Sequence, residues 1–176
     1  MSNALSRRAF FKVGMVGGLA LATAGGLYRL TRPAGVPHRF VLDSGARKVL
    51  VAIAPVILAG AMRPDGAGRQ ADIQAAIERT MAAIGGLPLR TQKEVQDLFA
   101  LLALAPGRRF LAGVPDDWAS ARQEDLAAFL QSWRVHRIGM LQTAYQALHD
   151  LVAGAWYADE STWAAIGYPG PMKELS

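Results

Sequence analysis

The sequence predicts an all-α protein, and three observations lead to that class. Apolar residues recur at steps of three and four in several stretches, as on one face of an amphipathic helix. Alternation of apolar and polar residues over strand-length runs is absent from the sequence. No Asn-Gly or Asp-Gly pair stands between β-branched runs, as a hairpin would require. We therefore expect a small helical domain of about five helices.

Composition divides the chain into four parts. Residues 1–28 form a basic and then apolar segment, and residues 29–44 form a linker broken by Pro33, Gly35 and Pro37. Residues 45–156 carry the helical patterns and are expected to be the folded domain. Residues 157–176, rich in Gly, Pro and aromatic residues, are expected to be an extended C-terminal tail.

The first two helices of the domain follow from caps and breakers. Asp43 or Ser44 can cap a helix over about 46–61. Pro55 lies inside that run and should kink the helix or split it in two. A second helix is expected over 70–84, because Gly85-Gly86-Leu87-Pro88 ends its apolar pattern.

Two capping-box patterns predict the next two helix starts. Thr91–Glu94 precedes a helix that Pro106-Gly107 should stop, and Ser120–Gln123 precedes a clean apolar stripe. The stripe consists of Leu126, Phe129, Leu130 and Trp133. A last helix or bent pair of helices, the longest in the chain, is expected from about Ile138 to Trp156.

Net charge does not indicate a nucleic-acid partner. The chain carries +5 and has a pI of about 10.0. Arg7, Arg8 and Lys12 lie in the first 28 residues, which hold no acidic residue. Without that segment, the chain has sixteen basic and fourteen acidic residues. This small excess of positive charge does not indicate binding to DNA or RNA.

The N-terminus has the pattern of a twin-arginine export signal. Its residues are Ser6, Arg7, Arg8, Phe10, Phe11 and Lys12, followed by an uncharged run to Tyr28. Phe11 is the single, conservative departure from the pattern Ser-Arg-Arg-x-Phe-Leu-Lys. Ala22 and Ala24 form a candidate cleavage site. We expect a periplasmic protein exported by the twin-arginine translocon, with two alternatives open: a cleaved signal, or an uncleaved one holding the chain at the inner membrane.

The residues offer little for catalysis or metal binding. The chain has no cysteine, which excludes disulfides, thiolate metal sites and c-type haem attachment. Its three histidines, His38, His136 and His149, are scattered. We predict no catalytic residue and no metal ligand. Arg108-Arg109 beside Phe110 is interpreted as a solvated turn rather than a phosphate site.

Aromatic residues gather near the C-terminus. Trp156, Tyr157, Trp163 and Tyr168 lie within thirteen residues and precede Pro169-Gly170-Pro171. A short tail cannot bury four large rings by itself. We expect Trp156 and Tyr157 to pack on their own domain, and Trp163 to Pro171 to dock on a partner, since Trp and Tyr are favoured interface anchors.

Together these segments resemble a known family. The stretches 129–134, 144–148, 156–159 and 163–171 look like the gluconate 2-dehydrogenase small-subunit (subunit 3) type. The sharpest similarity is at Tyr168–Pro171, and the twin-arginine leader is typical of the family. The resemblance implies a membrane-associated, chaperone-like accessory subunit without a cofactor of its own. Its expected partners are a flavin-dependent large subunit of the glucose–methanol–choline class, which holds FAD, and in some complexes a c-type cytochrome.

On this resemblance the chain is expected to be non-catalytic and to bind the large subunit, which it carries through the translocon and stabilises in the periplasm. The expected partner-binding residues are Trp133, Arg134, Tyr145, Trp156, Tyr157, Trp163, Tyr168, Pro169, Gly170 and Pro171. The alternative is a stand-alone exported helical protein that binds an apolar small ligand, which a large internal cavity would favour. An independent enzyme would need a titratable cluster in a cleft.

Overall fold

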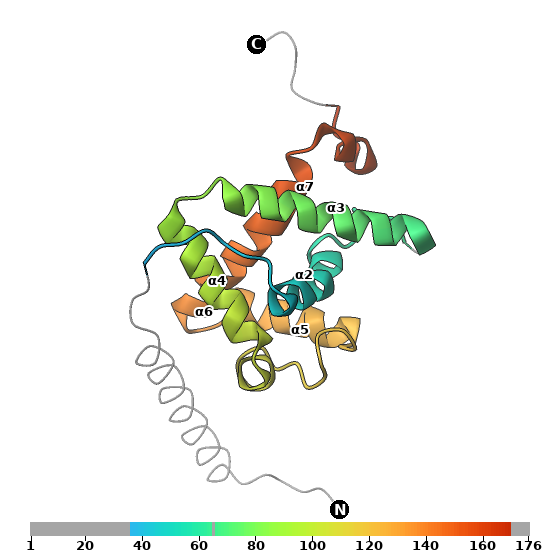
Figure 1. Ribbon diagram of the computed structural model, residues 1–176. Helices are drawn as coiled ribbons and strands as arrows, with labels where there is room; N and C mark the ends of the chain where they lie inside the picture. Colours follow the sequence, from blue (N-terminus) through green and yellow to red (C-terminus); the bar gives the residue numbers. More distant parts are fainter. Residues whose placement is uncertain (1–35, 65, 170–176) are drawn as a thin grey trace, which may run out of the picture. The chain divides into compact units, whose positions relative to one another are not determined.

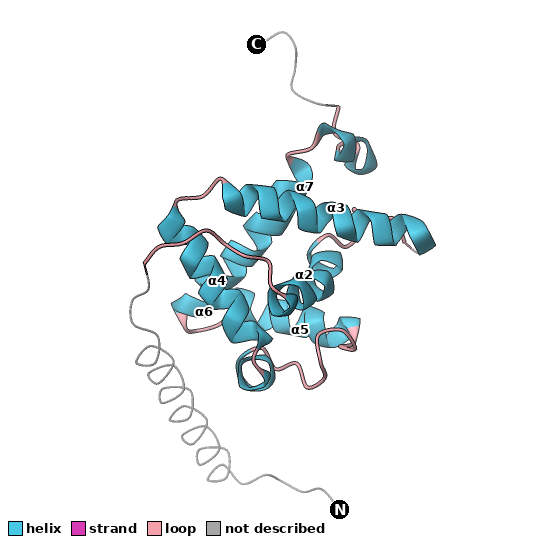
Figure 2. Ribbon diagram, viewed as in Figure 1, coloured by secondary structure: helices cyan, strands magenta, loops and turns pink. Residues whose placement is uncertain are grey.

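The computed structural model describes residues 36–64 and 66–169, and over these ranges the chain is helical and contains no β-strand (Figures 1 and 2). The all-α prediction is confirmed. The predicted export signal, with its cleavage site, lies outside the described residues, as do Gly170 and Pro171. The α-helices are α2 (Ser44–Ile57), α3 (Gly66–Gly85), α4 (Leu89–Ala103), α5 (Gln123–Arg134), α6 (Gly139–His149) and α7 (Ala155–Tyr157).

The last predicted helix is one continuous run with an irregular centre. A π-helical turn, η2 (Asp150–Gly154), joins α6 directly to α7. With that run taken as one helix, the described domain has the five main helices that the sequence predicts. Among the described residues the longest α-helix is α3, with 20 residues, so the expectation that the last helix is the longest was wrong there.

Helix α2 occupies the centre of the fold and packs against α3, α4 and α5 (Figure 1). The Asp43 side chain caps it as predicted, accepting a hydrogen bond from the Ala46 N–H at 2.7 Å. Pro55 does not split the helix, which continues to Ile57. Pro55 lacks the N–H that would bond to the carbonyl four residues earlier, and the helix ends two residues after it.

Neither predicted capping box forms. Helix α4 already begins at Leu89, and α5 begins at Gln123 without a side-chain cap. Gln92, assigned to the first box, is instead 4% exposed, and its Oε1 accepts the Phe40 N–H at 2.9 Å. Its Nε2 donates to the Leu87 carbonyl at 2.8 Å. Residues 38–43, predicted as linker, are therefore a strap that α4 holds against the domain; we call them the N-terminal strap.

An aromatic cluster anchors the long connection between α4 and α5. Phe129 packs edge-on between Trp118 and Trp133, with ring centroids 5.9 and 4.8 Å away. The Trp118 indole donates to the Leu102 carbonyl at 2.9 Å, and the Trp133 indole donates to the Leu111 carbonyl at 3.0 Å. The predicted stripe on α5 is confirmed as core. These bonds fix the π-helical turn η1 (Gly107–Leu111) against the helices.

Candidate partner-binding surface

Helix α7 packs on helix α3, and the residues that follow α7 are partly helical rather than extended. Two short 3₁₀ helices, η3 (Glu160–Thr162) and η4 (Ala164–Ile166), follow α7. We call residues 156–168 the C-terminal cap. Trp156 is 5% exposed, and the guanidinium carbon of Arg79 on α3 lies 4.7 Å from the centre of its ring. The expectation that Trp156 packs on its own domain is confirmed.

Arg79 and Asp159 clamp the cap to α3. An Arg79 Nη2 lies 2.6 Å from an Asp159 carboxylate oxygen. The other carboxylate oxygen accepts the Ser161 N–H at 2.9 Å and so caps η3. Hydrogen bonds from Ser161, joined by the positive charge of Arg79, hold the pKa of Asp159 below its ordinary value. The clamp is therefore charged at neutral pH.

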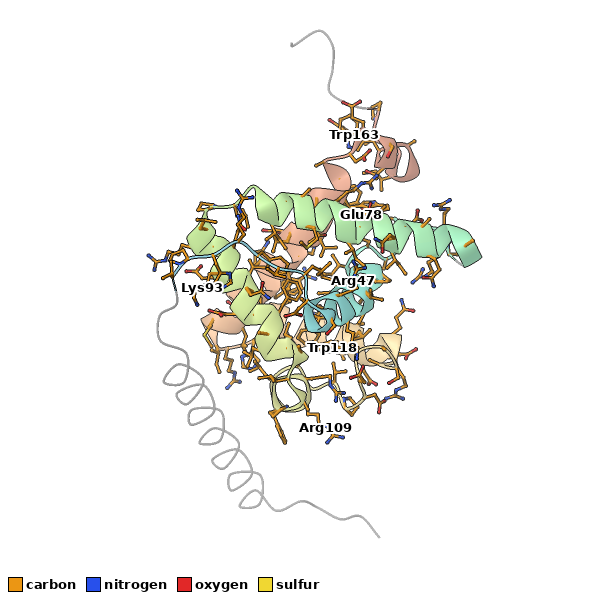
Figure 3. All side chains as sticks on the ribbon, in the orientation of Figure 1. Arg47, Glu78, Lys93, Arg109, Trp118 and Trp163 are labelled. Atoms are coloured by element: carbon orange, nitrogen blue, oxygen red, sulfur yellow. The ribbon has the colours of Figure 1, made fainter. Side chains whose placement is uncertain are left out.

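Trp163 forms the inner support of the cap. Its indole donates to the Tyr157 carbonyl at 2.8 Å, and its carbonyl accepts the Tyr168 N–H at 3.0 Å. The rings of Trp163 and Tyr168 meet edge-on, with centroids 5.1 Å apart. Gly167 makes the turn between them with φ of +71°, a conformation that favours glycine. In Figure 3, Trp163 lies in the C-terminal segment, and the ribbon of α3 runs between Trp163 and Trp118.

The outer side of the cap presents apolar surface. Tyr168 is 45% exposed and Ile166 is 50% exposed. Both are held by the hydrogen bonds and the ring contact of Trp163. A large side chain that is already ordered costs less conformational entropy on binding than one on a mobile tail. The cap can therefore act as a preformed contact surface.

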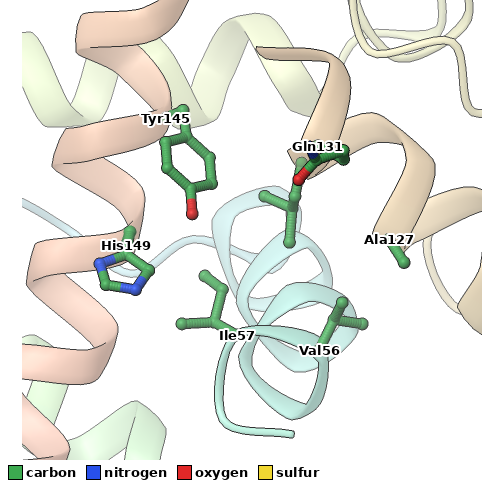
Figure 4. A pocket seen from close by; sticks show the side chains of 7 residues that line it. Val56, Ile57, Ala127, Gln131, Tyr145 and His149 are labelled. Atoms are coloured by element: carbon green, nitrogen blue, oxygen red, sulfur yellow. The ribbon is translucent and has the colours of Figure 1, made fainter. Parts of the chain in front are cut away.

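A second feature is a small groove between α2, α5 and α6. Figure 4 shows Tyr145 and His149 of α6 facing Val56 and Ile57 of α2. Its volume is about 190 Å³, below the roughly 300–1,000 Å³ of small-molecule pockets. The rings of Tyr145 and His149 lie 5.7 Å apart. Next to His149 in the chain, Asp150 accepts hydrogen bonds from His149 and Gln146, which lower the pKa of its carboxyl.

The structure brings some predicted partner-binding residues together and separates others. The cap gathers four of them: Trp156, Tyr157, Trp163 and Tyr168. Pro169 is exposed at its end. Tyr145 lies apart from these, half-buried in the groove. Arg134 is exposed at the end of α5.

Trp133 requires a correction. It is 1% exposed and sits in the aromatic core, so it cannot contact a partner in this fold. Trp156 is likewise buried and supports the cap from inside. Both are expected at the partner interface on the family resemblance, but their helical spacing is also that of core positions.

Sequence reasoning also misread or missed three charged residues. Arg108, interpreted as part of a solvated turn, is 9% exposed and donates to the Pro115 carbonyl at 3.0 Å. Arg79 and Asp159 were not singled out. Their pairing joins positions far apart in the chain, and no local pattern signals such a contact.

No protein-family model, curated protein or solved structure matches the chain. Within the described residues, no three His, Asp or Glu side chains are placed to share a metal ion. Over the same residues, no helix combines the length and the apolar character needed to cross a bilayer.

Proposed function

We propose that this chain is the exported, non-catalytic small subunit of a flavin-dependent dehydrogenase. In this account the large subunit, of the glucose–methanol–choline class, holds FAD and performs the oxidation. The twin-arginine signal on this chain takes the pair through the translocon to the periplasm. There the small subunit stabilises its partner, and a c-type cytochrome completes some complexes. Support comes from the sequence at Ser6–Lys12 and Gly167–Pro171 and from the form of the cap.

The observation that carries the proposal is the ordered cap. It presents Ile166 and Tyr168 on a base fixed by Trp163 and clamped by Arg79. Aromatic side chains held in place are typical energetic centres of protein interfaces. The groove at Tyr145 has room for a partner side chain rather than a drug-sized ligand. These features favour a protein partner over the alternative of a small apolar ligand.

Two variants test the surface. The double variant Ile166→Ala/Tyr168→Ala should weaken capture of the flavoprotein by at least about tenfold, since a hot-spot truncation costs about 2 kcal/mol. The matched control is Phe110→Ala, because Phe110 is 75% exposed and lies in η1, outside the cap. Equal capture of the flavoprotein by both variants would contradict a role of the cap in binding it.

Export of the pair is tested separately. The variant Arg7→Lys/Arg8→Lys should leave the chain and its flavoprotein together in the cytoplasm. Release of the flavoprotein to the periplasm by this variant would contradict a carrier role. Capture of the flavoprotein by the stranded variant shows that binding does not need the signal.

A further inference from the structure

The connection between α5 and α6 exposes a cluster of aliphatic side chains. Val135 is 65% exposed, Ile138 is 54% exposed and Met140 is 68% exposed. Single exposed apolar residues are ordinary on protein surfaces, but here three lie within six positions of one short connection. We call residues 134–140 the α5–α6 loop, which appears as the pink segment between these helices in Figure 2.

The fold holds this loop outward. Trp133 before it and Leu141 after it are both buried, so the two ends are fixed in the core. Between them the His136 ring nitrogen accepts the Ile138 N–H at 3.1 Å and shapes the reversal. The aliphatic side chains are therefore displayed by a defined turn rather than by a frayed end.

Two arginines stand among these side chains. Arg134 and Arg137 are both exposed, and neither forms an ion pair with any carboxylate of the described residues. The sequence from 132 to 149 contains no acidic residue. The loop thus combines free positive charge with aliphatic surface, without an aromatic anchor or a pocket.

We propose that the α5–α6 loop is a contact site for an anionic lipid surface. Aliphatic side chains enter the boundary between headgroups and acyl chains, while arginine heads remain at the phosphates and bind them through paired N–H groups. Binding then draws on apolar burial and on charge together. A protruding loop without aromatic anchors fits a protein hot spot less well. The inference does not depend on the flavoprotein partner.

The test uses the full chain and a local probe. Because the chain has no cysteine, Ile138→Cys can carry a single environment-sensitive dye, and Phe110→Cys is the matched exposed control. Vesicles of phosphatidylglycerol mixed with phosphatidylcholine are compared with vesicles of phosphatidylcholine alone. We expect a blue shift at position 138 on the anionic vesicles only, and none at position 110.

Charge is tested on the same labelled chain. Arg134→Gln/Arg137→Gln should raise the lipid concentration needed for the dye response by about tenfold or more, since each arginine near an anionic surface strengthens binding about fivefold. Arg39→Gln/Arg47→Gln removes the same charge from exposed positions outside the loop and should leave the response unchanged. A silent dye at 138, equal responses at 138 and 110, or a response that requires a protein partner would each overturn the proposal.

Discussion

At the scale of single residues, Arg79 connects helix α3 to the C-terminal cap through three contacts. It stacks on Trp156, pairs with Asp159 and lies within 3.5 Å of the Ser161 hydroxyl. One of its guanidinium nitrogens and the Trp156 indole nitrogen are buried without an acceptor among the described protein atoms. Holding the cap therefore leaves these two donors unsatisfied within the described residues, at a cost in desolvation energy.

Removing this contact should loosen the cap without unfolding the core. Arg79→Ala should lower the free energy of unfolding by about 1 kcal/mol, because the ion pair with Asp159 is partly exposed and the contact with the Trp156 ring is lost with it. Arg69→Ala, whose side chain contacts only backbone carbonyls, should change it by less than about 0.5 kcal/mol. Urea unfolding followed by tryptophan fluorescence measures both, and equal losses would contradict the role of Arg79.

Acid should release the same clamp. The pKa of Asp159 is lower in the folded chain than in the unfolded one, so its stabilisation is fully present above the unfolded pKa of about 3.9. That stabilisation is lost as the pH falls through the folded pKa. We expect the NMR signal of the Trp163 indole N–H to shift on acidification below pH ~4. Asp159→Asn should remove this step, and an unchanged step in that variant would assign it to another group.

At the scale of elements, the N-terminal strap is fastened to α4 by amide side chains. Gln92 accepts the Phe40 N–H, Gln96 accepts the Val41 N–H at 2.8 Å, and the Phe40 ring packs on Phe99 at 5.8 Å. Gln92→Leu leaves buried backbone groups without partners and should cost about 1–3 kcal/mol. The exposed Gln142→Leu is the control. Equal stability of the two variants in thermal unfolding would show that the strap contributes nothing.

The turn η1 depends on a close approach between backbones. A Cβ at Gly107 would collide with the Leu101 carbonyl oxygen. Gly107→Ala should therefore force a backbone shift and destabilise the fold by about 1–3 kcal/mol. Gly154 has open space around its Cα, so Gly154→Ala should stabilise the helix by about 0.5–1 kcal/mol. Calorimetry of both variants measures whether the free energy of unfolding falls for Gly107→Ala and rises for Gly154→Ala. An unchanged stability of Gly107→Ala would show that the backbone of η1 can move away without cost.

At the scale of the whole molecule, the periodic features could be predicted from the sequence and the long-range contacts could not. The stripe on α5 and the break at residues 85–88 depend on neighbours within one or two turns, so local spacing was enough. The first capping box failed because Gln92 bonds to Phe40, 52 positions away. The clamp between Arg79 and Asp159 is invisible to local patterns for the same reason, and the extra residue of a π-helical turn leaves little trace in helical spacing.

The aromatic content of the C-terminal residues predicts a contact surface for a partner, which stays a prediction, and the fold determines which of the rings are exposed. Trp156 supports the cap from inside, and Trp163 holds Tyr168 in place. Composition does not distinguish these aromatic residues from one another. Their burial in the fold shows which rings are exposed to a partner and which pack inside the cap.

The proposed pairing of this chain with a flavoprotein can be tested directly. The most direct measurement is affinity purification of the C-terminally tagged chain from its native cells, with a visible absorbance spectrum of the eluate. The account predicts a larger second chain in stoichiometric amount, with the absorbance of bound flavin. A single colourless chain of 176 residues or its processed form would contradict the account.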